Sequence, residues 1–485
     1  MRRAALRVLM TIVSLLVGAG GAHAQRLSIR NDAQTPASCR IEPSGRMIAV
    51  PPRTMVSIVP AGDETIDTAR CNGLSVRALG VLRDGVGAML RLNGRQTRVL
   101  NVALYPFIPS LPDGNFDALV AHVVAVYQHE HPDVLLHAAM SDRIDIYDPA
   151  KLKRFLSRGG FDVMEIDTLY LRMLAGSGTI LPAHPASQTT WPAGLDAVTV
   201  DGVFYGVPSW LCLDFIYMRD PALKSVRSLP DLLAVLSRHS AKERLLSADL
   251  SGTTRLPSIY MNAYAQDHGY ESLSAAMKKA PDADVIHDLA ALAATCSQGT
   301  RNPCADGTLT RAPDGEIDRQ FAIGESVADI GFSEQSFYID RYAPKGATVP
   351  TMIPVAWGRS PAPMLYSDAF VTSAQTCSNA ACGRDAEAFT RMMTGAAMKT
   401  FIAFSEDLRG HAPPRHLLVA TRPFWDQSRV RKDPVYRQVI PAVRTARAFP
   451  SDLDGATRDT MALDICRALR RSIPSYDCGD TRGPM

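Results

Sequence analysis

Short apolar runs alternate with segments of helical periodicity over most of the chain, and this alternation constrains the fold more than any other feature of the sequence. Residues 99–105, 161–166 and 327–332 are short and apolar, as buried strands are. Residues 116–127 repeat apolar side chains at helical spacing, and residues 385–404 also indicate a helix. Strands that alternate with helices are typical of an α/β fold with mostly parallel sheets. This part of the chain is long for one core, which predicts two lobes.

Residues 25–98 follow a different pattern, which predicts a small β-rich domain. Four β-favouring runs recur there, with Pro, Gly, Asp and Asn between them. The runs are residues 47–50, 55–59, 74–79 and 88–92. We find no catalytic pattern in this segment, and its role stays open.

The first residues predict a secretory signal peptide. Arg2, Arg3 and Arg7 precede an apolar run at residues 8–17, and the sequence Ala-His-Ala follows at the exit. A basic start, a short apolar core and small residues at the exit mark export, and the core is too short to span a bilayer. We therefore expect a secreted or periplasmic protein, cleaved near Ala24, with no membrane anchor.

These patterns together predict a signal peptide (1–24), a β-rich domain of unknown role (25–98) and a two-lobed domain (99–485). Loss of the signal peptide removes three arginines and takes the formal charge from +3 to about zero. Nucleic-acid binding uses a broad basic surface, which a near-neutral chain lacks. We therefore expect no nucleic-acid partner.

Cysteine usage singles out one residue. The chain has nine cysteines, an odd number for an exported protein. Eight are close sequence neighbours, which close short disulfide loops in an oxidising compartment, although sequence alone does not fix the connectivity. The neighbours are Cys39 with Cys71, Cys296 with Cys304, Cys377 with Cys382, and Cys466 with Cys478. Cys212 is left over: either a buried core cysteine, as its apolar neighbours Leu211 and Leu213 favour, or a thiol kept free for nucleophilic chemistry.

The sequence predicts neither a metal centre nor a cofactor. Its cysteines lack the paired spacing of a zinc site. His129, His131 and His137 cluster at the expected end of a surface helix, where we expect them to be solvated.

Three side chains lie at or just after the ends of the predicted strands: Tyr105, Asp167 and Glu334. In open α/β sheets, ligands bind beyond the carboxyl ends of the strands, so these residues are the first site candidates. Each residue also has a structural alternative. Asp commonly serves as a loop or cap residue, Glu as a solvated carboxylate, and Tyr as a packing residue.

Six segments, in order along the chain, resemble thiamine pyridinylases, also called thiaminase I. The most specific is residues 205–212 (Tyr-Gly-Val-Pro-Ser-Trp-Leu-Cys), because the family has a Tyr-Gly-x-Pro stretch that leads into its catalytic cysteine. The other segments are residues 103–109 (Ala-Leu-Tyr-Pro-Phe-Ile-Pro), 161–167 (Phe-Asp-Val-Met-Glu-Ile-Asp), 251–255 (Ser-Gly-Thr-Thr-Arg), 330–334 (Ile-Gly-Phe-Ser-Glu) and 365–368 (Leu-Tyr-Ser-Asp). The resemblance implies a type II periplasmic-binding-protein fold and a catalytic role for residues 99–485.

By this resemblance, Cys212 is the nucleophile and Glu334 the base that takes its proton. A thiol is a poor nucleophile until it loses its proton, and a thiolate adds to an electron-poor pyrimidine ring and assists expulsion of the thiazole of thiamine. Other residues would bind the substrate. Asp167 and the loop residue Asp368 would hold the pyrimidine, and three tyrosines would stack on the rings. The tyrosines are Tyr105, Tyr147 and Tyr366.

The implied partners are thiamine and a small amine or thiol nucleophile, bound by a monomer. The main alternative is a solute-binding protein that delivers a small ligand, such as thiamine or a sugar, to an ABC importer, because such proteins share the two-lobed fold and also contain Tyr-Gly-x-Pro stretches. A cysteine hydrolase would need a histidine beside Cys212, and none of the six segments contains one. An interaction protein built around residues 25–98 stays open.

Overall fold

The computed structural model describes residues 26–60, 65–79, 87–111, 116–158, 160–239, 244–252, 255–355, 362–450, 453 and 455–478. The predicted signal peptide and residues 253 and 254 lie outside these ranges. The predicted domain boundary falls at the first residues of strand β8 (Arg98–Ala103).

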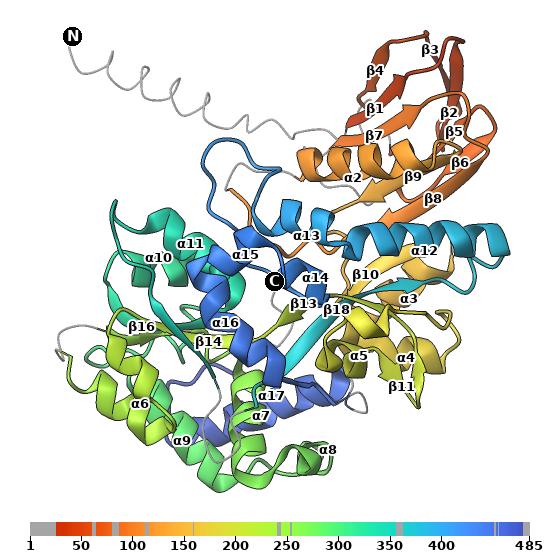
Figure 1. Ribbon diagram of the computed structural model, residues 1–485. Coiled ribbons are helices and arrows are strands. Elements are labelled where there is room, and N and C mark those ends of the chain that lie inside the picture. Colours follow the sequence, from red (N-terminus) through yellow and green to blue (C-terminus); the bar gives the residue numbers. More distant parts are fainter. Residues whose placement is uncertain are drawn as a thin grey trace, which may run out of the picture.

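The N-terminal region is rich in strands, as the sequence predicts, and it lies at one end of the molecule (Figure 1). A three-stranded sheet has the order β4-β1-β7, and a four-stranded sheet has the order β3-β2-β5-β6. The strands are β1 (Arg26–Asn31), β2 (Ala37–Glu42), β3 (Arg46–Val50), β4 (Met55–Ile58), β5 (Thr68–Cys71), β6 (Leu74–Val76) and β7 (Gly87–Leu92).

Polar contacts fix this region to the rest of the chain. Arg77 donates to the buried carboxylate of Asp162 at 2.7 Å, and the backbone N–H of Arg77 donates to Asn101 Oδ1 at 3.0 Å. The side chain of Gln128 donates to the backbone carbonyl of Arg91 at 3.0 Å. The β-rich region is therefore held to β8 and its neighbours by several hydrogen bonds.

The first lobe is built on a seven-stranded sheet of order β19-β13-β18-β10-β8-β9, with β20 paired to β18. Besides β8, its strands are β9 (Val134–Ala139), β10 (Val163–Asp167), β13 (Val207–Cys212), β18 (Met364–Thr372), β19 (Leu418–Val419) and β20 (Arg447–Ala448). Strands β8, β9 and β10 run parallel, whereas β18 is antiparallel to both β10 and β13. A two-stranded hairpin, β11 (Thr199–Val200) with β12 (Val203–Phe204), is separate from this sheet.

The second lobe contains a four-stranded sheet of order β15-β16-β14-β17. Its strands are β14 (Asp214–Met218), β15 (Arg244–Ser247), β16 (Ser326–Phe332) and β17 (Thr351–Pro354). Only Leu213 separates β13 of the first sheet from β14 of the second. The two-lobed α/β prediction is confirmed, but the prediction of mostly parallel sheets is wrong. The chain passes directly from β13 of the first sheet into β14 of the second, and it later returns to the first sheet as β18. Strand β14 is therefore antiparallel to both of its neighbours, β16 and β17.

Helices cover the sheets and connect the lobes (Figure 1). They are α2 (Asp117–Glu130), α3 (Pro149–Ser157), α4 (Leu171–Gly176), α5 (Pro192–Ala197), α6 (Leu229–Leu236), α7 (Arg255–His268), α8 (Leu273–Ala276), α9 (Ala283–Ala294), α10 (Glu316–Ala322), α11 (Ser336–Tyr342), α12 (Ala380–Thr394), α13 (Ala396–Ala403), α14 (Arg422–Trp425), α15 (Ser428–Lys432), α16 (Pro434–Thr445) and α17 (Gly455–Arg470). The single helix predicted at residues 385–404 is in fact two, because Gly395 adopts an extended conformation that ends α12 and begins α13.

The cysteine prediction is confirmed. Disulfides join Cys39 to Cys71, Cys296 to Cys304, Cys377 to Cys382 and Cys466 to Cys478, and Cys212 is free. In the part of the chain that the structure describes, no helix has the length and apolar character needed to cross a bilayer.

A fully buried ion pair secures the segment that follows β8. Arg415 forms a two-pronged pair with Asp407, with distances of 2.5 and 2.7 Å. Its Nε also donates to the carbonyl of Pro109 at 2.7 Å, and Nη1 donates to the carbonyl of Ile402 at 2.9 Å. Both charged side chains are shielded from water, so removal of one leaves the other unpaired in the interior.

We expect Arg415→Leu to lower the free energy of unfolding by about 3 to 5 kcal/mol, because Asp407 is left buried without its partner. The matched variant is Arg391→Leu, which removes an exposed pair with Glu387 and changes stability by less than about 1 kcal/mol. Urea denaturation followed by circular dichroism measures both. Equal losses in the two variants would contradict the assignment of the buried pair as a structural anchor.

Candidate active site

Three neighbouring strands of the first sheet bring together Cys212, Asp368 and Asp167. Asp167 ends β10 and stands opposite Asp368 of β18, while Cys212 ends β13 and stands opposite Tyr366. The Cys212 sulfur lies 3.8 Å from Asp368 Oδ2. A β-bulge at Ser209 shifts the register of β13 against β18, and such bulges redirect the side chains that follow. Cys212 as a whole residue is half-buried.

The second lobe contributes Glu334 to the same region. Strand β14 begins two residues after Cys212 and pairs with β16, and Glu334 follows β16 in the short 3-10 helix Ser333–Gln335. The Glu334 carboxylate accepts a hydrogen bond from Ser333 Oγ at 3.4 Å. Its charge acts on the Cys212 thiol, although no direct hydrogen bond between the two is present among the described residues. Glu334 therefore approaches the thiol from the opposite lobe.

Burial and neighbouring carboxylates control ionisation here. Burial raises the pKa of the Cys212 thiol well above its ordinary value, and the negative charges of Asp368 and Glu334 raise it further. Burial and the charge of Asp167 likewise raise the pKa of Asp368. Burial raises the pKa of Glu334 to about 7. The thiol is thus protonated near neutral pH, and the Glu334 carboxyl, whose charge acts on it, is suited to exchanging protons at that pH.

The predicted tyrosines join this cluster from two sides. The hydroxyls of Tyr105 and Tyr147 are 3.2 Å apart, and Phe107 packs against both rings. Tyr366 stacks on Phe449 with ring centroids 5.0 Å apart. Tyr366 and Asp368 lie within β18, so the expectation that they belong to a loop is wrong. All seven predicted residues are linked to one another by hydrogen bonds, strand pairing or mutual charge effects.

A buried lysine that the sequence analysis missed supports the strands beneath the thiol. Lys399 of α13 is fully buried, and its ammonium donates to Ser209 Oγ at 2.5 Å. Ser209 in turn donates to Glu165, whose other oxygen accepts the backbone N–H of Tyr105 at 3.0 Å. The ammonium also lies 3.3 Å from the ring centroid of Trp210. We call Lys399, Ser209 and Glu165 the lysine network.

Burial lowers the pKa of Lys399 to about 7, while the charges of Glu165 and Asp368 oppose that shift. The only advance sign of this network was a lysine among apolar helix residues, with Met398 before it and Phe401 and Ile402 after it.

Two arginines were also missed as partners of the acidic groups. Arg255, at the start of α7, donates to Asp214 at 3.3 Å and is almost fully buried. Asp214, two residues after Cys212, is held by Arg255 and Ser258, and its charge also raises the pKa of the Cys212 thiol. Arg458 of α17 lowers the pKa of Asp167 through its charge, against the larger effect of burial. The carboxylates are therefore partly balanced by cations on their inner side.

The histidine prediction is wrong for His137. Its side chain is 1% exposed within β9, and burial lowers its pKa to about 4. His131 instead packs against the ring of Tyr127. Among the described residues, no group of three or more His, Cys, Asp or Glu side chains is placed to hold a metal ion.

Comparisons with known proteins identify the fold. No family model matches the sequence, and no curated protein matches it. Thiaminase I from Bacillus thiaminolyticus has a TM-score of 0.58 and 21% identity over 77% of this chain and 99% of its own. Clostridium botulinum thiaminase I in complex with thiamin has a TM-score of 0.61 and 17% identity over 77% of this chain and 100% of its own. Maltose-bound MalE3 of T. maritima has a TM-score of 0.58 and 11% identity over 79% of this chain and 97% of its own.

At these identities the similarity establishes the fold and not the activity. The chain has the two-lobed fold of type II periplasmic-binding proteins, shared by the thiaminases and the sugar-binding proteins. The fold implied by the sequence resemblance is thereby confirmed. The roles of the seven site residues stay predictions.

We expect the Cys212 thiol to react slowly with iodoacetamide at neutral pH and faster at high pH, because burial and carboxylates raise its pKa. Asp368→Asn removes one of those negative charges, so the midpoint of the labelling profile falls by about one pH unit. Mass spectrometry of the intact protein counts the added groups.

The matched control is Asp464→Asn, which removes an exposed carboxylate on α17 and leaves the midpoint unchanged. Because the other eight cysteines are bridged, Cys212→Ser abolishes labelling of the native protein. A midpoint that is the same in Asp368→Asn and the parent protein contradicts the proposed electrostatic coupling.

Proposed function

We propose that this chain is a thiaminase I-type transferase, which cleaves thiamine and transfers its pyrimidine methylene group to an amine or thiol. The observation that carries the proposal is the free Cys212 sulfur, 3.8 Å from the Asp368 carboxylate and within the electrostatic reach of Glu334. A protein that only binds a ligand has no need of a free thiol beside such a group. The similarity to thiaminase structures supports the same function.

The charge of the site favours a cationic ligand. Asp167, Asp368, Glu334 and Asp214 all act on the Cys212 thiol, and each makes its ionisation harder. A positive ligand beside the sulfur reverses this effect and lowers the pKa of the thiol. Thiamine carries its positive charge on the thiazolium ring, so the substrate itself would help to activate the nucleophile. A neutral sugar would not.

In the proposed reaction, Glu334 takes the proton of Cys212, and the sulfur forms a bond to a ring carbon of the pyrimidine. The bond from the methylene carbon to the thiazolium nitrogen then breaks, and its electron pair leaves with the neutral thiazole. Glu334 releases its proton to water and takes a proton from the incoming amine or thiol, which bonds to the methylene carbon. Expulsion of the Cys212 thiolate restores the aromatic ring, and Glu334 returns the proton to sulfur.

The remaining predicted residues would hold the substrate. Asp167 and Asp368 are opposite one another on adjacent strands and would accept hydrogen bonds from the amino group and a protonated ring nitrogen of the pyrimidine. Tyr105 and Tyr147 form an aromatic wall with Phe107 and Tyr366 lies across from Cys212. Aromatic faces suit both a flat pyrimidine and a cationic thiazolium.

The alternative is a solute-binding protein that delivers a small ligand to an ABC importer. The maltose-bound structure favours it, because its TM-score equals that of one of the thiaminases. In that case Cys212→Ser would bind its ligand as tightly as the parent protein does, and no thiazole would form.

We also propose that the protein is exported and acts as a monomer. Four disulfides are typical of chains that fold in an oxidising compartment.

With thiamine and aniline or pyridine, we expect the mature protein to release free thiazole, detected by liquid chromatography. Cys212→Ser and Glu334→Gln should each lower kcat by at least about a thousandfold, because they remove the nucleophile and its base. Failure of the parent protein with every amine and thiol tried would place the binding function above the enzyme function.

The control is Glu406→Gln, which removes an exposed carboxylate far from Cys212 in sequence and keeps full activity. Calorimetric titration of Cys212→Ser with thiamine separates loss of chemistry from loss of binding. Thiamine binding without turnover in the parent protein would identify a thiamine carrier.

We expect kcat/KM to rise with pH through about 7, where Glu334 loses its proton and becomes a base. The sign follows from the direction of the shift: burial raises the pKa of this carboxyl, so its base form appears near neutrality instead of in acid. In Glu334→Gln, the residual kcat/KM should not rise with pH in this range. A rise of kcat/KM centred near pH 4.5, the ordinary pKa of Glu, would contradict the assignment of Glu334 as the base.

A further inference from the structure

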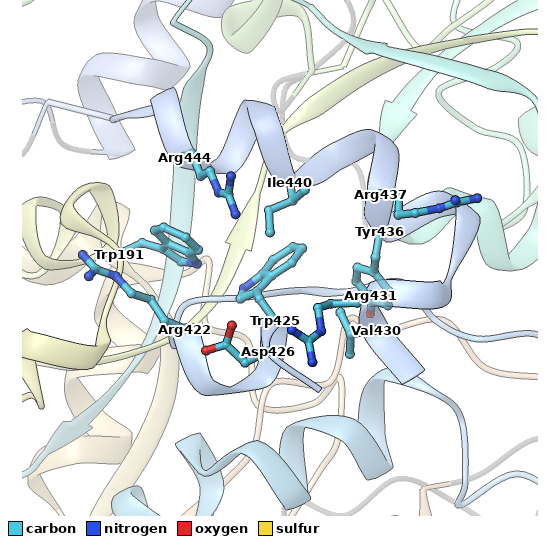
Figure 2. Close-up of a pocket in the computed structure, with 10 residues that line it drawn as sticks. All are labelled: Trp191, Arg422, Trp425, Asp426, Val430, Arg431, Tyr436, Arg437, Ile440 and Arg444. Atoms are coloured by element: carbon cyan, nitrogen blue, oxygen red, sulfur yellow. The ribbon is translucent and has the colours of Figure 1, made fainter. Parts of the chain in front are cut away.

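A second candidate site lies outside the cluster around Cys212, where α14, α15 and α16 meet the segment before α5. A pocket of about 460 Å³ lies there, which is within the range of small-molecule sites, and Figure 2 shows the side chains that line it. Two tryptophans, Trp191 and Trp425, and several arginines line it. We call it the arginine pocket.

The arginines of this pocket lack ionic partners. Arg422, Arg431 and Arg444 are exposed, and none has a carboxylate within 4.0 Å among the described residues. Arginines elsewhere on the surface commonly do pair, as Arg391 and Arg429 do with Glu387 and Glu406. Asp426 is the one acidic side chain among the described residues that line the pocket. The net charge of the arginine pocket is therefore strongly positive.

The floor of the pocket is aromatic and rigid. Trp191 and Trp425 pack edge to face, with ring centroids 6.5 Å apart. The Trp425 N–H donates to the carbonyl of Val419 at 2.8 Å and fixes that ring on the edge of the first sheet. The Trp191 Nε1 is buried and has no hydrogen-bond partner among the described residues, so a donor is left unused. An apolar floor strengthens the attraction between the arginines and an anion, because it lowers the local dielectric constant.

The arginines surround the aromatic floor. In Figure 2, Arg422 and Arg444 lie on either side of Trp191, Arg431 lies beyond Trp425, and Arg437 points away from both rings. The Arg422 guanidinium lies 5.2 Å from the centre of the Trp191 ring. Planar guanidinium groups bind phosphate oxygens through paired hydrogen bonds. Three exposed arginines around one pocket, with a single carboxylate beside them, suit a ligand that carries more than one negative charge.

We propose that the arginine pocket binds a small diphosphate. The guanidinium groups of Arg422, Arg431 and Arg444 bind its phosphate oxygens. The shared chemistry covers inorganic pyrophosphate and organic diphosphate esters. This site is independent of the proposed thiamine chemistry, because none of its residues belongs to the cluster around Cys212.

The test is calorimetric titration of the mature protein with inorganic phosphate, pyrophosphate and ADP at constant ionic strength. We expect saturable one-to-one binding of pyrophosphate, at least about tenfold tighter than that of phosphate. Binding of ADP with similar affinity assigns the site to organic diphosphates, whereas binding of pyrophosphate alone assigns it to the inorganic anion. Absence of saturable binding of both diphosphates overturns the proposal.

The double variant Arg422→Gln/Arg444→Gln should weaken pyrophosphate binding by at least about tenfold. The matched control, Arg384→Gln/Arg409→Gln, removes the same charge from exposed residues outside the pocket and should change the affinity by less than about twofold. All four side chains are exposed, so both proteins should fold, which thermal denaturation verifies. Equal weakening in the two variants shows diffuse attraction by net charge and overturns the proposal.

Discussion

The buried amino group of Lys399, whose pKa burial lowers to about 7, is the constraint on which the arrangement around Cys212 depends. An ion in the protein interior loses several kcal/mol of hydration unless other groups replace the water, so the surrounding strands must meet its requirements. Ser209, Glu165 and the face of Trp210 do this together. Because Ser209 is the bulged residue of β13, the contact that satisfies the lysine is made where the register shifts ahead of Cys212. Glu165 extends the same network to the backbone of Tyr105.

The acidic groups that act on the sulfur come from both lobes, and their origin explains the electrostatics. Asp167 and Asp368 belong to paired strands of one sheet, whereas Glu334 follows a strand of the other sheet. Lys399 and Arg458 compensate part of this charge from the interior. The thiol is consequently a weak acid in the free protein. A cation bound beside the sulfur would lower the pKa of the thiol.

The sequence predicted contacts between residues that are near one another in the chain. It did not predict contacts between residues that are far apart in the chain. The four disulfides join neighbours no more than 32 residues apart, and pairing by proximity predicts all of them. The lysine network joins Lys399 to Ser209 across 190 positions and Ser209 to Glu165 across 44, and no periodicity reveals such contacts. The antiparallel insertion of β18 was missed for the same reason. His137 was misplaced because β9 is buried on both faces, which its proximity to the exposed His129 concealed.

The single residue between β13 and β14 has a mechanical consequence. Leu213 is the link by which the chain passes from one sheet to the other at this point, and the sulfur of Cys212 is attached directly before it. A rotation of one lobe against the other about this link would turn the backbone within a residue or two of the thiol, and it would move Glu334, which belongs to the second lobe, relative to the sulfur. A small fluorophore attached to Cys212 would therefore report opening and closing of the molecule without any further engineering of cysteines.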